Sequence, residues 1–148
     1  MMNRSTLIAT LFATMLGALS PAWAGEPTCG PCGMKIDVKN RVHFRYTLTD
    51  GKAVELGSLT CAKNYWSEHK TEKLIFTAVD FVTGKMIPAD TAHYLVGSNL
   101  KVGTGMDKGS VVVFGDRKMA DKAKAANGGR VVGLNEALNH AARAQHAH

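Results

Sequence analysis

The chain has 148 residues and a formal net charge of +6 at pH 7, with 18 lysines and arginines against 12 acidic residues. The basic residues are scattered and do not alternate with aromatic residues, which argues against a nucleic-acid-binding surface. We interpret the charge as a contribution to solubility, or as a means of attracting an acidic partner.

The first 24 residues have the pattern of a secretory signal peptide. Arg4 supplies a positive start, residues 7–19 form an uncharged apolar run, and Ala22-Trp23-Ala24 places small residues where a signal peptidase cuts. The run is shorter than the ~20 residues of a membrane-spanning helix, and Cys29 lacks the residues expected before a lipidated cysteine. We therefore expect a single domain over residues 25–148, exported to the periplasm in soluble form without a stable membrane anchor.

Residues 42–82 predict two strands, a helix and a third strand. Polar and apolar residues alternate over 42–49, and an Asp50-Gly51 turn leads to a second strand at 52–56, which indicates a hairpin. Ser58 is a suitable N-cap for a helix over 59–69, where apolar residues recur at helical spacing. The third strand is expected at 74–82.

Residues 93–133 repeat this order. Strands are expected at 93–96 and 110–114, followed by a helix over 118–127 that Asp116 caps and Gly128-Gly129 ends. A short strand at 130–133 and a helix from Leu134 to the terminus complete the chain. The repeated order predicts an α+β domain built from two similar ββαβ-type units.

Cys29-Gly30-Pro31-Cys32-Gly33-Met34 is the most informative stretch of the sequence. Cys-Gly-Pro-Cys matches the thioredoxin motif, but that chemistry needs its first cysteine at the start of a helix that follows a strand. Only four residues separate Cys29 from the expected mature N-terminus, too few for such a strand. A thiol–disulfide oxidoreductase that uses Cys29 and Cys32 is therefore the weaker alternative.

Metal binding is the favoured interpretation of the same stretch. A structural zinc site would require four ligands, and the chain offers one Cys-x-x-Cys pair. Thiolate and thioether sulfurs are soft donors that select Cu(I), and the nearby glycines allow the backbone to turn so that both can converge. We predict that the bound metal is Cu(I).

The sequence also resembles the NosL-like copper proteins that serve the maturation of nitrous oxide reductase. The resemblance covers nearly the whole mature chain and rests on an ordered set of motifs. In chain order these are Cys32-Gly33-Met34, Asp50-Gly51, Cys61, Val79-Asp80-Phe81, residues 83–87, residues 92–98, Met106 and Asn127-Gly128-Gly129. It implies a NosL/MerB-like fold, which is shared with organomercurial lyase. It also implies a chaperone that delivers Cu(I) to a cuproprotein such as nitrous oxide reductase. The partners implied are this acceptor and its maturation factors.

The leading hypothesis for the site is that Cys32, Met34 and Met106 hold Cu(I), and that Cys29 or Cys61 completes the shell. His93 is a further candidate ligand. Structural roles remain open for these residues. They are a disulfide for Cys29 and Cys32, a core position for Cys61, core packing for Met34 and Met106, and a hydrogen-bonded structural histidine for His93.

Other histidines receive a different interpretation. His140, His146 and His148 lie near the C-terminus and suit Cu(II), Ni(II) or Zn(II), so a metal-scavenging tail is a further alternative. His43 is expected at a surface or edge position. No catalytic motif with paired carboxylates, a nucleophile elbow or a phosphate loop is present in the sequence, so we do not expect an enzyme.

Overall fold

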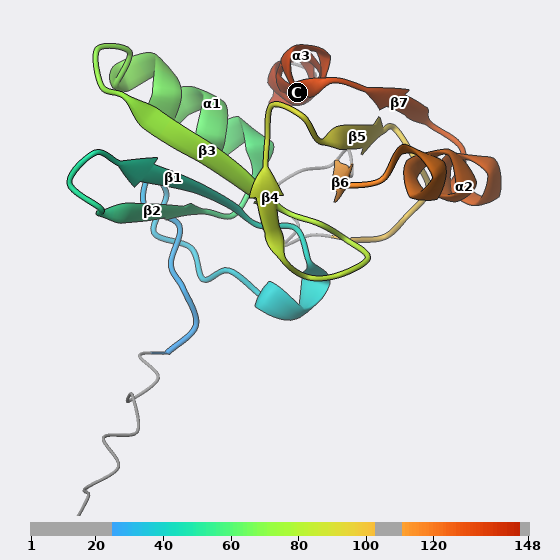
Figure 1. Ribbon diagram of the computed structural model, residues 1–148, viewed down its shortest axis with the longest axis horizontal. Coiled ribbons are helices and arrows are strands. Elements are labelled where there is room, and N and C mark those ends of the chain that lie inside the picture. Colours follow the sequence, from blue (N-terminus) through green and yellow to red (C-terminus); the bar gives the residue numbers. More distant parts are fainter. Residues whose placement is uncertain (1–24, 103–110, 146–148) are drawn as a thin grey trace, which may run out of the picture.

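Two antiparallel sheets organise the chain in the computed structural model, which describes residues 25–102 and 111–145 (Figure 1). The first sheet has the strand order β2-β1-β3-β4, and the second has the order β6-β5-β7. The elements are η1 (Val38–Asn40), β1 (Phe44–Leu48), β2 (Ala53–Leu56), α1 (Leu59–Glu68), β3 (Leu74–Val79), β4 (Met86–Pro88), β5 (His93–Val96), β6 (Val112–Phe114), α2 (Arg117–Asn127), β7 (Arg130–Val132) and α3 (Leu134–Gln145).

The two sheets contain the same unit. In each, the first strand lies in the middle, its hairpin partner lies on one side, and the strand that follows the helix lies on the other. The unit reads β1-β2-α1-β3 in the first sheet and β5-β6-α2-β7 in the second. The predicted α+β class and the repeated ββαβ units are therefore confirmed.

Local signals explain where the helices begin. The Ser58 side chain accepts a hydrogen bond from the N–H of Cys61 at the start of α1. Asp116 accepts one from the N–H of Met119 at the start of α2. Each side chain satisfies a backbone donor that the first helical turn leaves without a partner, as predicted for both positions.

The third strand is shorter than expected because of Asp80. The strand ends at Val79, and the Asp80 carboxylate then accepts hydrogen bonds from the N–H and hydroxyl of Thr83 and from the N–H of Gly115. These bonds turn the chain into β4 and tie the turn to the end of β6. The sequence pattern did not indicate β4, which has only three residues and pairs with the C-terminal end of β3.

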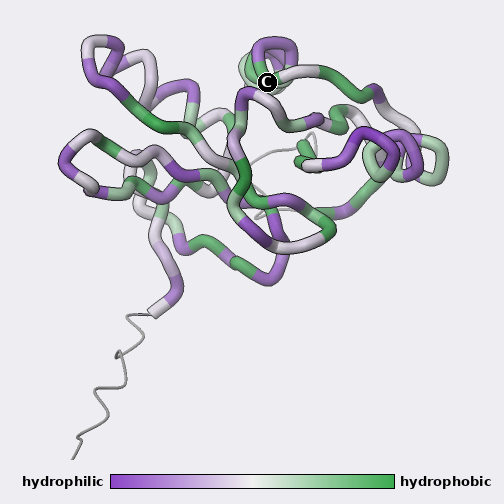
Figure 2. The backbone as a smooth tube through the Cα atoms, in the orientation of Figure 1, coloured by the Kyte–Doolittle hydropathy of each residue, from purple (hydrophilic) through white to green (hydrophobic). Residues whose placement is uncertain are grey.

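One main core joins the two sheets, and a smaller cluster lies beneath α2. Residues of β5 and β6 alternate between the two clusters, so both strands are buried on both faces. Figure 2 shows that α2 is largely hydrophilic, and Ala120 is its buried residue. Tyr94, Val96, Val111 and Val113 belong to the main core, and Leu95, Val112, Phe114 and Ala120 form the smaller cluster.

The C-terminal helix connects the two units. α3 contacts α1 of the first unit and β5 of the second, and its buried Ala137 and Ala141 belong to the main core. Within residues 25–102 and 111–145, no helix combines the length and apolar character that crossing a membrane would require.

Candidate metal centre

The Cys-Gly-Pro-Cys-Gly-Met stretch forms a tight hairpin. Thr28 and Lys35 pair as an antiparallel bridge at its base. The Cys29 N–H donates to the carbonyl oxygen of Met34 at 2.8 Å, and the Gly33 N–H donates to the carbonyl oxygen of Cys29 at 2.8 Å. Gly33 has a φ of +71°, which glycine adopts without steric strain. Cys29 therefore lies in a hairpin and not at the start of a helix, where a thioredoxin-type cysteine would lie.

The hairpin, which we call the cysteine hairpin (residues 28–35), is attached to the edge strand β2. The Gly30 N–H donates to the carbonyl oxygen of Glu55 at 2.8 Å. A Cβ atom on Gly30 would lie 2.7 Å from Cγ1 of Val54, closer than two carbon atoms can approach without movement. A residue without a side chain is therefore needed where the hairpin crosses β2.

The strand beneath the hairpin is held by a charged network. The Glu55 carboxylate contacts Nε2 of His43 and accepts a hydrogen bond from Nε of Arg45 at 2.6 Å. His43 is only 7% exposed and directly precedes β1, which lies between β2 and β3, so the expected surface or edge position for this residue is wrong. Its ring is buried because the carboxylate on the neighbouring strand provides a polar partner.

Cys61 brings a third thiol to the cysteine hairpin. It lies in the first turn of α1, and its N–H donates to Oγ of Ser58 at 3.0 Å. Its Sγ lies 3.7 Å from Sγ of Cys32, and the Sγ atoms of Cys29, Cys32 and Cys61 all lie within 4.8 Å of one another. We call these three residues the cysteine cluster. All three are thiols, and this arrangement could hold a metal ion.

The cluster is open on one side. Cys29 is fully buried, Cys61 is half-buried, and Cys32 is exposed. Met34 is 47% exposed at the end of the same hairpin. A metal ion held by the three sulfurs would therefore be reached from solvent on the side of Cys32.

The thiols differ in acidity. The pKa of Cys61 is raised to about 12, mainly by burial; the nearby Cys29 and Cys32 thiols contribute to the increase, and the hydrogen bond with Ser58 opposes it. Burial also raises the pKa of Cys32, but hydrogen bonds from the Met34 backbone and from the Cys29 and Cys61 thiols outweigh it and hold this pKa below its usual value. Cys32 therefore forms a thiolate more readily than Cys61, and a bound cation would favour the thiolate form of Cys61.

The structure brings together some of the predicted ligands and not others. Cys29, Cys32 and Cys61 meet, and Met34 lies in the same hairpin. His93 begins β5 in the second sheet and is not a member of the cluster. Met106 lies outside the described residues, as do His146 and His148.

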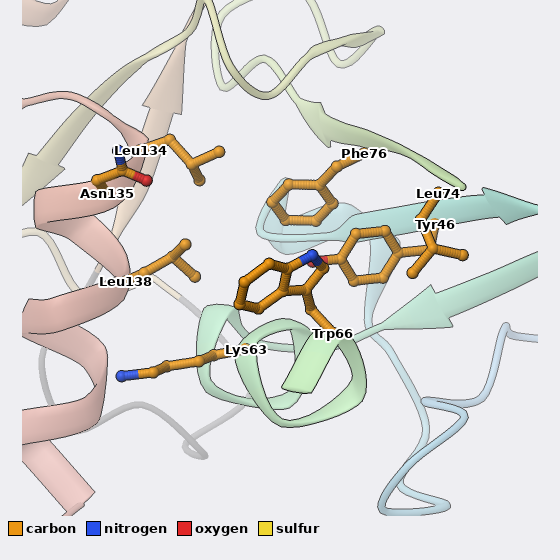
Figure 3. A pocket seen from close by; sticks show the side chains of 8 residues that line it. All are labelled: Tyr46, Lys63, Trp66, Leu74, Phe76, Leu134, Asn135 and Leu138. Carbon is orange, nitrogen blue, oxygen red and sulfur yellow. The ribbon is translucent and has the colours of Figure 1, made fainter. Parts of the chain in front are cut away.

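A separate cavity of about 280 Å³ lies between α1, the first sheet and α3 (Figure 3). Its walls are mainly aromatic and aliphatic, with Lys63 at one side, and no cysteine lines it. It therefore offers no sulfur donors for a metal ion. The lining residues are Tyr46, Lys63, Trp66, Leu74, Phe76, Leu134, Asn135 and Leu138.

Comparisons with known proteins agree with this fold. The crystal structure of the copper chaperone NosL from Shewanella denitrificans matches with a TM-score of 0.57 and 21% sequence identity, over 74% of this chain and 87% of that one. Comparison with curated proteins gives no significant match. The model of the NosL family matches residues 22–141, which is most of the sequence. The chain belongs to the NosL family.

Proposed function

We propose that this protein is a periplasmic Cu(I) chaperone, which carries one copper ion on the cysteine cluster and delivers it to an acceptor cuproprotein. The observation that carries the proposal is the convergence of three thiols within 4.8 Å of one another. Membership of the NosL family supports it. The acceptor that we propose is nitrous oxide reductase, and its maturation factors are further proposed partners.

The donor chemistry favours Cu(I) over other cargo. Thiolates are soft ligands, and Cu(I) accepts a shell of two or three sulfurs. Zn(II) in a structural site takes four ligands, and no histidine or carboxylate of the described residues joins the three cysteines within the same cluster. Binding requires the thiols to lose protons, so Cu(I) affinity should rise with pH.

The methionines extend the proposed shell. Met34 is exposed in the same hairpin, two residues from Cys32, and we propose that its thioether contacts the ion without adding charge. Met106 is a further proposed ligand. His93 lies on the second sheet, so we assign it no place in the shell that the described residues form.

The open side suggests how copper leaves. A ligand of the acceptor can approach on the side of Cys32, while Cys29 and Cys61 still hold the ion from the buried side. The ion then passes by stepwise ligand exchange, so it is never released to water. No group of this chain is oxidised or reduced during such a transfer.

A transfer assay tests this function. The mature protein loaded with one equivalent of Cu(I) should metallate copper-free nitrous oxide reductase, measured by the copper spectrum and activity of the acceptor. The Cys32→Ser variant, which removes the exposed anionic donor, should transfer much less, and free Cu(I) with a chelator of equal affinity provides the control. Equal metallation by the wild type, the variant and the chelator would contradict a chaperone role.

A further inference from the structure

All three thiols lie within 4.8 Å of one another, and Cys32 and Cys61 form a pair that joins two separate elements of the fold. Sγ of Cys32 and Sγ of Cys61 lie 3.7 Å apart, in van der Waals contact. A disulfide requires about 2.05 Å between the sulfurs, so a small shift of the hairpin would suffice. Cys32 is exposed in a hairpin turn, whereas Cys61 is fixed in the capped first turn of α1.

We propose that Cys32 and Cys61 form a reversible disulfide that switches the cysteine cluster between a metal-binding and a closed form. The oxidant is a disulfide of a small molecule or of an oxidoreductase. The Cys32 thiolate attacks it, forms a mixed disulfide and releases one thiolate of the oxidant. The Cys61 thiolate then attacks Sγ of Cys32 and releases the second. The two cysteines lose two electrons and two protons, and the oxidant becomes two thiols.

Exposure determines the order of these steps. Cys32 is the exposed member of the cluster, so an external disulfide reaches it first. Cys29 is fully buried, and both its N–H and its carbonyl oxygen are bonded within the hairpin. A Cys29–Cys32 bond would have to form inside this already closed turn. Cys61 approaches from a separate element and is the resolving cysteine.

The consequence for copper rests on the proposed function. A Cys32–Cys61 disulfide removes two of the three thiolate donors, so the oxidised protein should not retain Cu(I). Bound Cu(I) should in turn protect both thiols from oxidation, because the sulfur lone pairs are engaged. In an oxidising compartment, the copper-free protein would then carry the disulfide. The disulfide would have to be reduced before the protein could bind Cu(I).

Disulfide mapping tests the pairing without copper. The reduced mature protein is treated with oxidised glutathione, its remaining thiols are blocked, and it is digested with trypsin without reduction. Cys29 and Cys32 lie on the peptide that ends at Lys35, and Cys61 lies on the peptide 53–63. We expect these two peptides to be joined. A lone first peptide that is lighter by two hydrogens, or glutathione adducts alone, would overturn the proposal.

Single variants distinguish which cysteine carries the link. Cys29→Ser should form the joined species at close to the wild-type rate, and Cys32→Ser should lose it. Equal linkage in Cys32→Ser would assign the bond to Cys29 and overturn the proposed pairing. In a separate arm, one equivalent of Cu(I) added before glutathione should prevent the link. A link that forms as fast with copper as without it would contradict copper binding at the cluster, and leave the pairing itself intact.

Discussion

Oγ of Ser58 accepts a hydrogen bond from the Cys61 N–H at 3.0 Å, so the residue that starts α1 also fixes the position of one thiol of the cysteine cluster. Ser58 is itself only 2% exposed. The start of the helix and the geometry of the metal centre therefore depend on the same contact. Variants at this cap should affect both stability and metal binding.

Ser58→Ala should lower the free energy of unfolding by about 1 kcal/mol, the usual effect of losing an N-cap. It should also weaken Cu(I) binding, because the first turn that carries Cys61 frays. Asp116→Ala is the matched control, since Asp116 caps α2 through the N–H of Met119 at 3.1 Å, and α2 carries no member of the cluster. Urea denaturation and Cu(I) titration should show a similar loss of stability in both variants, and weaker copper binding in Ser58→Ala alone. Equal copper affinities would contradict the role of this cap in the site.

Gly30→Ala should displace the cysteine hairpin from β2, because the new Cβ atom would lie 2.7 Å from Cγ1 of Val54. The hydrogen bond from Gly30 to Glu55 should weaken, and Cu(I) affinity should fall as Cys29 and Cys32 move away from Cys61. The double variant Gly30→Ala/Val54→Ala removes the clash and should recover most of the affinity. Copper competition assays on the two variants would measure this. A double variant no better than Gly30→Ala would show that the contact with Val54 is not the cause.

Asp80→Asn should lower the free energy of unfolding at neutral pH. It should also make that free energy less dependent on pH in the acidic range. Burial raises the pKa of Asp80, but hydrogen bonds from Thr83, Gly115 and Val82 outweigh it and hold the pKa below its usual value. A lowered folded-state pKa stabilises the protein above the unfolded-state value of about 4, and that contribution is lost as pH falls through the folded-state pKa. We expect a loss of about 1.5–3 kcal/mol at pH 7, the range for hydrogen bonds to a charged group.

Urea denaturation from pH 7 to pH 2 measures this difference. The difference in free energy of unfolding between wild type and Asp80→Asn should narrow as pH falls below about 4. Protonation then removes from the wild type the charge that the variant already lacks. Asp121→Asn is the control, since Asp121 is exposed on α2 and its partner Arg117 is exposed as well. A gap that stays constant with pH would contradict the proposed role of the Asp80 charge.

The secondary structure was largely predictable because its signals are local. Ser58, Asp116 and the Asp50-Gly51 turn each act within a few residues, and all three predictions are confirmed. The short strand β4 was missed because three residues carry no alternation, and its place depends on Asp80 bonding to Gly115, 35 residues away.

The site was only partly predictable. The sequence indicated Cys29, Cys32 and Met34 because they are neighbours in the chain. Cys61 remained an optional ligand because its approach to Cys32 depends on packing between α1 and the hairpin. The available signal was the spacing of three residues between the N-cap Ser58 and Cys61. That spacing places the cysteine in the first turn of the helix. The burial of His43 was not predictable, because it depends on Glu55 across the sheet.

Export should produce a mature chain that begins at Gly25 or within a residue or two of it. The reason is the small-residue pattern of Ala22-Trp23-Ala24 after the apolar run. Intact-mass measurement of protein from the periplasmic fraction checks this directly. Protein that retains Met1, or that carries a lipid adduct, would contradict soluble export.

Cu(I) binding by the cysteine cluster is the central claim, and a titration of the reduced protein against a competing Cu(I) chelator tests it most directly. We predict saturation at one equivalent per chain, and an X-ray absorption spectrum dominated by sulfur ligands. Each single change of Cys29, Cys32 or Cys61 to serine should weaken binding, and Met34→Leu should weaken it less, because a thioether carries no charge. The triple cysteine variant, shown by circular dichroism to be folded, should lose the high-affinity site. If the folded triple variant binds Cu(I) as tightly as the wild type does, the cysteine cluster is not the copper site.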